Sequence, residues 1–96
     1  MKQVYLLFSN EVKLEDERSM KLDYSLTERL SESEEKTPYY GIQIEKYLDD
    51  TVEKDEVTGI SNSKDTVISI IKKLFQYEVT PVSMVEIVDD LVTVGV

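Results

Sequence analysis

MKLDYSLTERL, residues 20–30, decides the fold, because apolar and polar side chains alternate along it. A period of two is typical of a β-strand that buries one face. We therefore predict a strand at about 19–30. One side of it is apolar and is expected to face the core: Met20, Leu22, Tyr24, Leu26 and Leu30.

The flanking segments show the same period. Upstream, residues of one parity predict a strand at about 3–14 and a turn at 15–18, with Val4, Leu6, Phe8, Val12 and Leu14 on the core side. Downstream, a polar connection at 31–37 precedes Pro38, which suits a strand start because proline cannot donate to a ladder. We predict a strand at 38–48, a charged connection at 49–56 and a short strand at 56–60.

The period then becomes helical. Ser61 to Ser63 offer N-caps for a helix at about 63–77, and Thr80 followed by Pro81 begins a second helix at about 81–93. Each predicted helix has one apolar side. In the second helix this side holds Met84, Val85, Ile87, Val88, Leu91 and Val92.

Together these elements predict one α+β domain over residues 1–96. Its expected architecture is an antiparallel β-meander of three to four strands, followed by two antiparallel helices packed on one sheet face. A chain of 96 residues is long enough for one core and leaves little volume for a deep pocket.

Composition excludes several kinds of site. The chain has no cysteine and no histidine, so it lacks thiolate chemistry, the commonest general base and the commonest transition-metal ligand. Its net charge of −9 disfavours direct nucleic-acid binding and suits a basic protein partner. The apolar run from Val4 to Phe8 is too short to cross a membrane, so we expect a cytoplasmic protein.

The acidic run DDTVEKDE, residues 49–56, does not have the ligand spacing or the glycine of a calcium loop. The carboxylates fall in predicted loops or on polar faces, so paired acid–base chemistry in a cleft is not indicated. We expect no catalytic residue, no metal site and no cofactor.

Two groups of side chains are candidate interaction surfaces. Tyr5, Tyr39 and Tyr47 have the parity opposite to the core, so we expect them on the sheet face that the helices leave open. Glu86, Asp89 and Asp90 repel one another and oppose the negative end of the second helix. Simpler explanations are good strand formation by tyrosine, and neutralisation of the acids by Lys72 or Lys73 or by solvent.

Several short segments also resemble a family of bacterial proteins of about 100 residues, found in clostridia and related Firmicutes and catalogued as a domain of unknown function. They are Tyr40-Gly41-Ile42, Ile44-Glu45-Lys46, Ile60-Ser61, Val79-Thr80-Pro81-Val82 and Val88-Asp89-Asp90. The resemblance implies a bacterial cytosolic protein and no activity, cofactor or catalytic residue. The chain departs from it at Asp16-Glu17, where the family commonly turns with Asp-Gly.

The function that these observations favour is a non-catalytic protein-interaction or regulatory role with an unidentified, basic protein partner. Self-association as a homodimer, through the open sheet face or a sheet edge, is a further expectation. The alternative is an acidic inhibitor that mimics nucleic acid, phage-derived or antitoxin-like. A third hypothesis is an enzyme that uses carboxylates alone.

Overall fold

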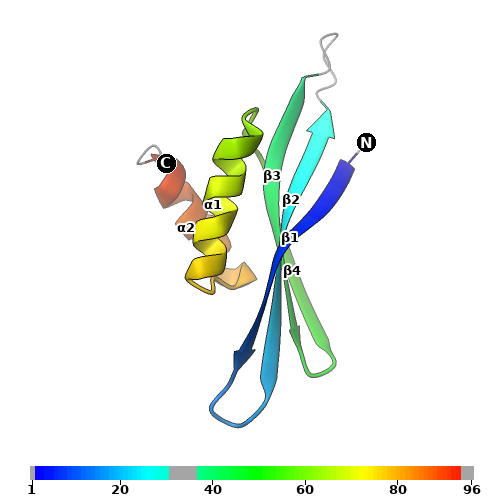
Figure 1. The fold of residues 1–96 in the computed structure, drawn as a ribbon, viewed down its shortest axis with the longest axis vertical. Coiled ribbons are helices and arrows are strands. Elements are labelled where there is room, and N and C mark those ends of the chain that lie inside the picture. The colour runs from blue at the N-terminus through cyan, green and yellow to red at the C-terminus, as the bar shows by residue number, and fades with distance from the viewer. Residues whose placement is uncertain (1, 31–36, 94–96) are drawn as a thin grey trace.

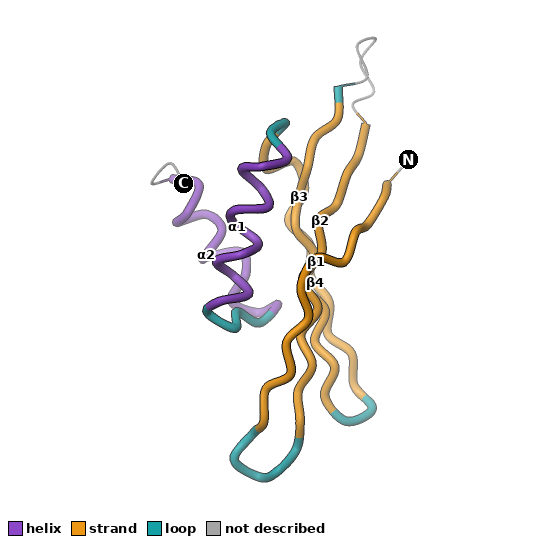
Figure 2. Tube along the Cα trace, in the orientation of Figure 1, coloured by secondary structure: helices purple, strands orange, loops and turns teal. Residues whose placement is uncertain are grey.

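The computed structural model of the chain describes residues 2–30 and 37–93. It contains strands β1 (Lys2–Lys13), β2 (Ser19–Leu30), β3 (Pro38–Leu48) and β4 (Thr51–Ser61), followed by helices α1 (Lys64–Gln76) and α2 (Pro81–Thr93). The strands form one antiparallel sheet in chain order, and both helices lie on one side of it (Figures 1 and 2). This confirms the predicted α+β class, with a meander and two helices. Residues 31–36 of the predicted polar connection lie outside the described residues.

β4 is longer than the strand predicted at 56–60. Only Asp49 and Asp50 form the turn, and Thr51 already pairs with Leu48. Asp49 takes a φ of 55°, a left-handed conformation that aspartate tolerates better than most residues. The charged residues that follow lie on an edge strand where solvent reaches them, so the ladder continues through a run that the sequence predicted as a loop.

A bulge in β1 reverses the predicted faces of its first half. Tyr5 pairs with Leu26 and Leu6 pairs with Ser25, but Phe8 pairs with Tyr24, so one extra residue lies between Leu6 and Phe8. Because paired residues share a face, Tyr5 lies on the helix side, whereas Val4 and Leu6 lie on the open side. The prediction that Val4 and Leu6 face the core and Tyr5 the open face is wrong.

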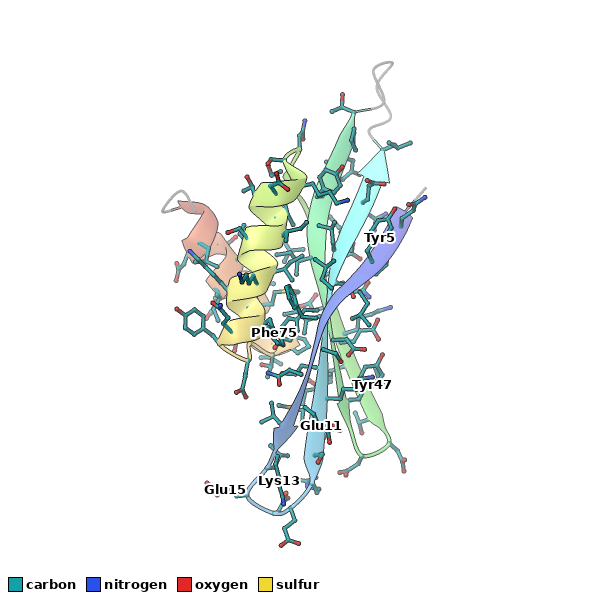
Figure 3. The ribbon with its side chains drawn as sticks, in the orientation of Figure 1. Tyr5, Glu11, Lys13, Glu15, Tyr47 and Phe75 are labelled. Atoms are coloured by element: carbon teal, nitrogen blue, oxygen red, sulfur yellow. The ribbon has the colours of Figure 1, made fainter. Side chains whose placement is uncertain are left out.

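The core lies between the sheet and the helices. It joins alternate residues of β2 and β3 to one side of each helix and to Val79 in the connection between the helices: Met20, Leu22, Tyr24, Leu26, Tyr40, Ile42, Ile44, Val67, Ile70, Ile71, Leu74, Val79, Met84 and Val88. Phe75 of α1, labelled in Figure 3, points toward the sheet. Its ring stacks on that of Phe8 of β1 with centroids 4.8 Å apart and meets the Tyr24 ring in a T-shaped arrangement at 5.8 Å. These rings attach the edge strand β1 to α1.

The connection between the helices is tightly bonded. α1 begins at the N-cap Ser63, whose hydroxyl accepts the Thr66 N–H at 3.3 Å. It ends in a Schellman-type turn, in which Glu78 has a φ of 54° and the Val79 N–H donates to the Leu74 carbonyl at 3.0 Å. The Tyr24 hydroxyl then donates to the Val79 carbonyl at 3.0 Å, so β2 fixes the point where α2 starts.

Candidate functional site

The three acids predicted as an interaction surface lie exposed on α2. Among the described residues, no ion pair within 4.0 Å joins Glu86, Asp89 or Asp90 to a lysine or arginine. Of the two simple explanations for the acids, an ion pair with Lys72 or Lys73 is therefore not seen, whereas their exposure fits screening by solvent.

Two valines accompany these acids. Val82 is 81% exposed and Val85 is 45% exposed, although the sequence placed Val85 on the apolar side of the helix. Met84 and Val88 occupy the contact with the rest of the protein, and Val85 lies just beyond it. Because residues three and four apart are neighbours on a helix, Val82 adjoins Val85 and Glu86. We call Val82, Val85, Glu86, Asp89 and Asp90 the α2 outer face.

The tyrosines do not form one surface. Tyr5 lies on the helix side, where the Lys64 ammonium is 5.9 Å from its ring centroid. Tyr39 and Tyr47 are half-buried on the open side of β3, and the Tyr47 hydroxyl donates to the Glu45 carboxylate. Figure 3 shows Tyr5 and Tyr47 toward opposite ends of the sheet. The bulge at Leu7 is the physical reason for the separation in faces.

The open face instead carries an ionic network that the sequence did not reveal. Glu56 of β4 accepts from the Lys2 ammonium at 2.5 Å and from the Arg29 guanidinium at 3.3 Å. Lys2 also lies 3.4 Å from the Gln43 amide oxygen, and Gln43 donates to Glu45 at 2.8 Å. Long side chains from both edges of the sheet thus meet across its centre. Three polar side chains on this face are buried: Ser25, Thr27 and Gln43.

The pKa of Glu56 is lowered by this network. Burial alone raises the pKa of a carboxyl, but the hydrogen bond and positive charge of Lys2, together with Arg29, outweigh burial. The Glu45 hydrogen bond, with burial and the Glu45 and Asp23 charges, raises the pKa of Tyr47 to about 12. The interactions behind these two pKa shifts stabilise the Glu56 carboxylate and the neutral Tyr47 phenol, which suits a structural network on the sheet.

A shallow depression of about 250 Å³ lies at the hairpin ends. The strands extend past the helices in this part of the molecule, as the ribbon in Figure 1 shows. Its charged lining residues are paired: Arg18 contacts Asp49 at 2.8 Å and Lys46 contacts Glu53 at 3.8 Å. Arg18 also contacts Asp16 at 2.6 Å and so connects the two hairpin turns. Both carboxylates that line the depression, Asp49 and Glu53, therefore form ion pairs with basic side chains of the protein.

The described acids are spread over the molecule. They occupy both sheet faces, both hairpin turns and both helices: Glu11, Asp23, Asp55, Asp16, Asp49, Asp65 and Glu86. In the described part of the chain they do not make the continuous row that a mimic of a phosphate backbone needs. Within residues 2–30 and 37–93, no three acidic side chains are placed to hold a metal ion. Neither described helix is long and apolar enough to span a bilayer.

The chain also matches a protein family. A model described as "Family of unknown function (DUF6514)" matches residues 3–94, which include most of β1 and the remaining elements of the fold. The comparison with curated proteins gives no match, and the comparison with solved structures gives none. The expected resemblance to a family of unknown function is confirmed at that level.

Proposed function

The chain belongs to this family of unknown function, and we propose that it acts as a non-catalytic interaction protein of the bacterial cytosol. The α2 outer face is the binding surface. Its partner is a basic, amphipathic protein segment, with apolar side chains that cover the two valines and lysine or arginine side chains that meet the acids.

The observation that carries this proposal is the exposure of Val82 beside the acids. An exposed valine gains about 1.5 to 3 kcal/mol when a partner buries it fully. Glu86, Asp89 and Asp90 attract a basic segment and orient it, an effect that acts mainly on the association rate and on specificity. Apolar contact and charge attraction thus act on one face.

The rigidity of α2 supports the same proposal. Met84 and Val88 are buried beneath the outer face, and the Tyr24 hydrogen bond to Val79 fixes the start of the helix. A surface held in one position loses little conformational entropy on binding, which favours affinity.

The alternative, an acidic inhibitor that mimics nucleic acid, has less support. The described acids lie on several surfaces, and Asp16, Asp23, Asp49, Glu53 and Glu56 have basic partners within the chain. Their negative charge is therefore partly neutralised within the chain, so less of it is available to attract a nucleic-acid-binding protein.

Photo-crosslinking provides the first test. A photoreactive phenylalanine analogue at position 82 should capture a partner through a basic segment, and the same analogue at the exposed position 52 of β4 should not. The captured segment, made as a synthetic peptide, is then titrated by calorimetry against the protein.

Three variants complete the test. Val82→Ser and the triple variant Glu86→Gln, Asp89→Asn, Asp90→Asn should each weaken binding, and only the triple variant should lose its salt dependence. The control triple variant Glu11→Gln, Glu15→Gln, Asp50→Asn removes three exposed acids elsewhere and should bind as the unmodified protein does. Equal binding by all variants would refute the proposal.

A further inference from the structure

The first half of β1 is an open sheet edge. β1 pairs with β2 on one side, and the sheet order places no described strand on its other side. An edge strand presents alternate backbone N–H and carbonyl groups that can extend the ladder to another chain. The bulge at Leu7 bends the strand, so Lys2–Leu6 is the regular segment before that bend.

The side chains of this segment do not protect it. Val4 is 44% exposed and Leu6 is 60% exposed, both on the open face. The first ten residues of the chain contain no acid, although the whole chain has a net charge of −9. Charged side chains are the usual protection of an edge, and here the single charged residue, Lys2, is engaged with Glu56 across the sheet.

The opposite edge is protected. β4 carries Glu53, Lys54 and Asp55 in succession, and its pairing with β3 is interrupted at residues 58–60. α2 also contacts β4. A sheet with one open and one protected edge can pair once and then has no open edge left, which gives a closed dimer and no filament.

We propose that Lys2–Leu6 pairs antiparallel with Lys2–Leu6 of a second copy, about a twofold axis at Val4. Val4 is the middle of the five regular residues, so this register uses the whole segment. It places Val4 against Val4 of the second copy, and Leu6 against the aliphatic stem of its Lys2. Because residues opposite each other in an antiparallel pair have their side chains on the same face, the open faces of the two copies lie on the same side of one eight-stranded sheet.

A second copy fits this edge because the segment is complementary to itself. Val4 is covered by Val4 of the second copy and Leu6 by the stem of its Lys2, and no acidic residue of either copy lies among the paired residues. The interface is small, so the dimer forms reversibly and depends on concentration. Because two copies of net charge −9 repel each other elsewhere, added salt strengthens this dimer.

Sedimentation velocity from micromolar to millimolar concentration tests the proposal. The unmodified protein should shift from monomer to dimer, at lower concentration in high salt. Leu6→Lys should stay monomeric, and the matched control Val52→Lys, on the same face of the other edge strand and 57% exposed, should dimerise as the unmodified protein does. A protein that stays monomeric throughout, a dimer that weakens in salt, or equal behaviour of the two variants would overturn the proposal.

Disulfide trapping tests the register independently. The chain has no cysteine, so Val4→Cys introduces a single thiol. Residues directly opposite in an antiparallel pair have Cα atoms about 4.5 to 5.5 Å apart, within reach of a disulfide. Val4→Cys should form a covalent dimer under mild oxidation and Val52→Cys should not. Failure of Val4→Cys to cross-link under conditions where the unmodified protein dimerises would overturn the register.

Discussion

The two faces of the sheet bury their side chains by different means. On the helix side, Leu22, Tyr24 and Leu26 of β2 are buried, and α1 packs against this strand. On the open side, Ser25 and Thr27 of the same strand are almost as inaccessible, although neither helix covers them. On that face Val4 and Leu6 of β1 lie opposite Thr27 and Ser25, and ion pairs of Glu56 with Lys2 and Arg29 reach across the sheet. Small polar side chains on a sheet face can therefore be buried without a second layer, by larger apolar and charged side chains of the neighbouring strands.

This difference predicts different sensitivities. The helix side is stabilised by removal of apolar area from water, which depends weakly on pH and salt. The open side is stabilised by ion pairs that need an ionised Glu56 and are screened by salt. Substitutions on the two faces should therefore differ in how much they lower the stability and in how that loss depends on pH and salt.

The largest effect is expected from Leu26→Ala on the helix side. Leu26 is fully buried, so its truncation should lower the free energy of unfolding by about 2–5 kcal/mol through lost burial and a cavity. Urea unfolding measures this value. Leu30→Ala, at the exposed end of the same strand, is the control and should change it little. A loss below about 1 kcal/mol for Leu26→Ala would contradict the described core.

Gly41→Ala should have the next largest effect, on the open side. A Cβ at this position would lie 2.3 Å from the Val57 carbonyl oxygen and 2.8 Å from the Thr27 hydroxyl, so β3 and β4 have to move apart. Overpacking of this kind costs about 1–3 kcal/mol. The amide resonances of β4 near Val57 should shift with the loss of stability. Unchanged resonances there would show that the close approach of the two strands is wrong.

Tyr24→Phe should cost less, about 1–2 kcal/mol, because it keeps the ring and leaves the buried Val79 carbonyl without its donor. Thermal unfolding measures the loss. The matched control is Tyr77→Phe, since Tyr77 is exposed and its change should be near zero. Equal effects of the two substitutions would argue against an anchored α2.

The smallest effect, and the one that depends on pH, is expected from Glu56→Gln. The folded protein lowers the pKa of Glu56 below the ordinary 4.5, so its contribution is present above pH 4.5 and is lost as pH falls through the lowered value. The difference in unfolding free energy from the unmodified protein should be up to about 1 kcal/mol at neutral pH. It should vanish in acid and shrink in high salt, as urea unfolding at a series of pH values can measure.

Glu53→Gln is the control for that series. Its carboxylate is more exposed and lies 3.8 Å from Lys46, so solvent screens the pair more strongly. If the loss of stability of Glu53→Gln depended on pH as that of Glu56→Gln does, the open-face network would not be the cause of the pH dependence.

Much of the fold follows from periodicity, and the misplaced residues have a physical cause. The alternation in β2 and β3 allows one assignment of faces, because their aliphatic residues all occur at one parity. In β1 the run from Val4 to Phe8 is apolar at both parities, so period two cannot locate an extra residue. A glycine within a strand pattern indicates irregular pairing, and Gly59 lies in the interrupted part of β4 with a φ of 64°.

The candidate surfaces could be predicted from the sequence in part. Helical geometry alone places Val82 opposite the apolar side, so its exposure could have been inferred, whereas Val85 lies at the limit of that side and depends on how closely α2 contacts its neighbours. The ionic network could not be inferred, since Lys2 and Glu56 are 54 residues apart and meet only through the register of four strands.

The succession of the elements bears on synthesis. The strands lie in the sheet in chain order, so each can pair with the one made before it as the chain leaves the ribosome. The apolar helix side, by contrast, stays uncovered until residues 64–91 have been made. Incomplete chains therefore expose apolar surface, and a chain that ends at residue 63 should scatter light and bind hydrophobic dyes where the full chain does not. The nascent protein is therefore prone to aggregation until the two helices have been synthesised and cover the apolar face of the sheet.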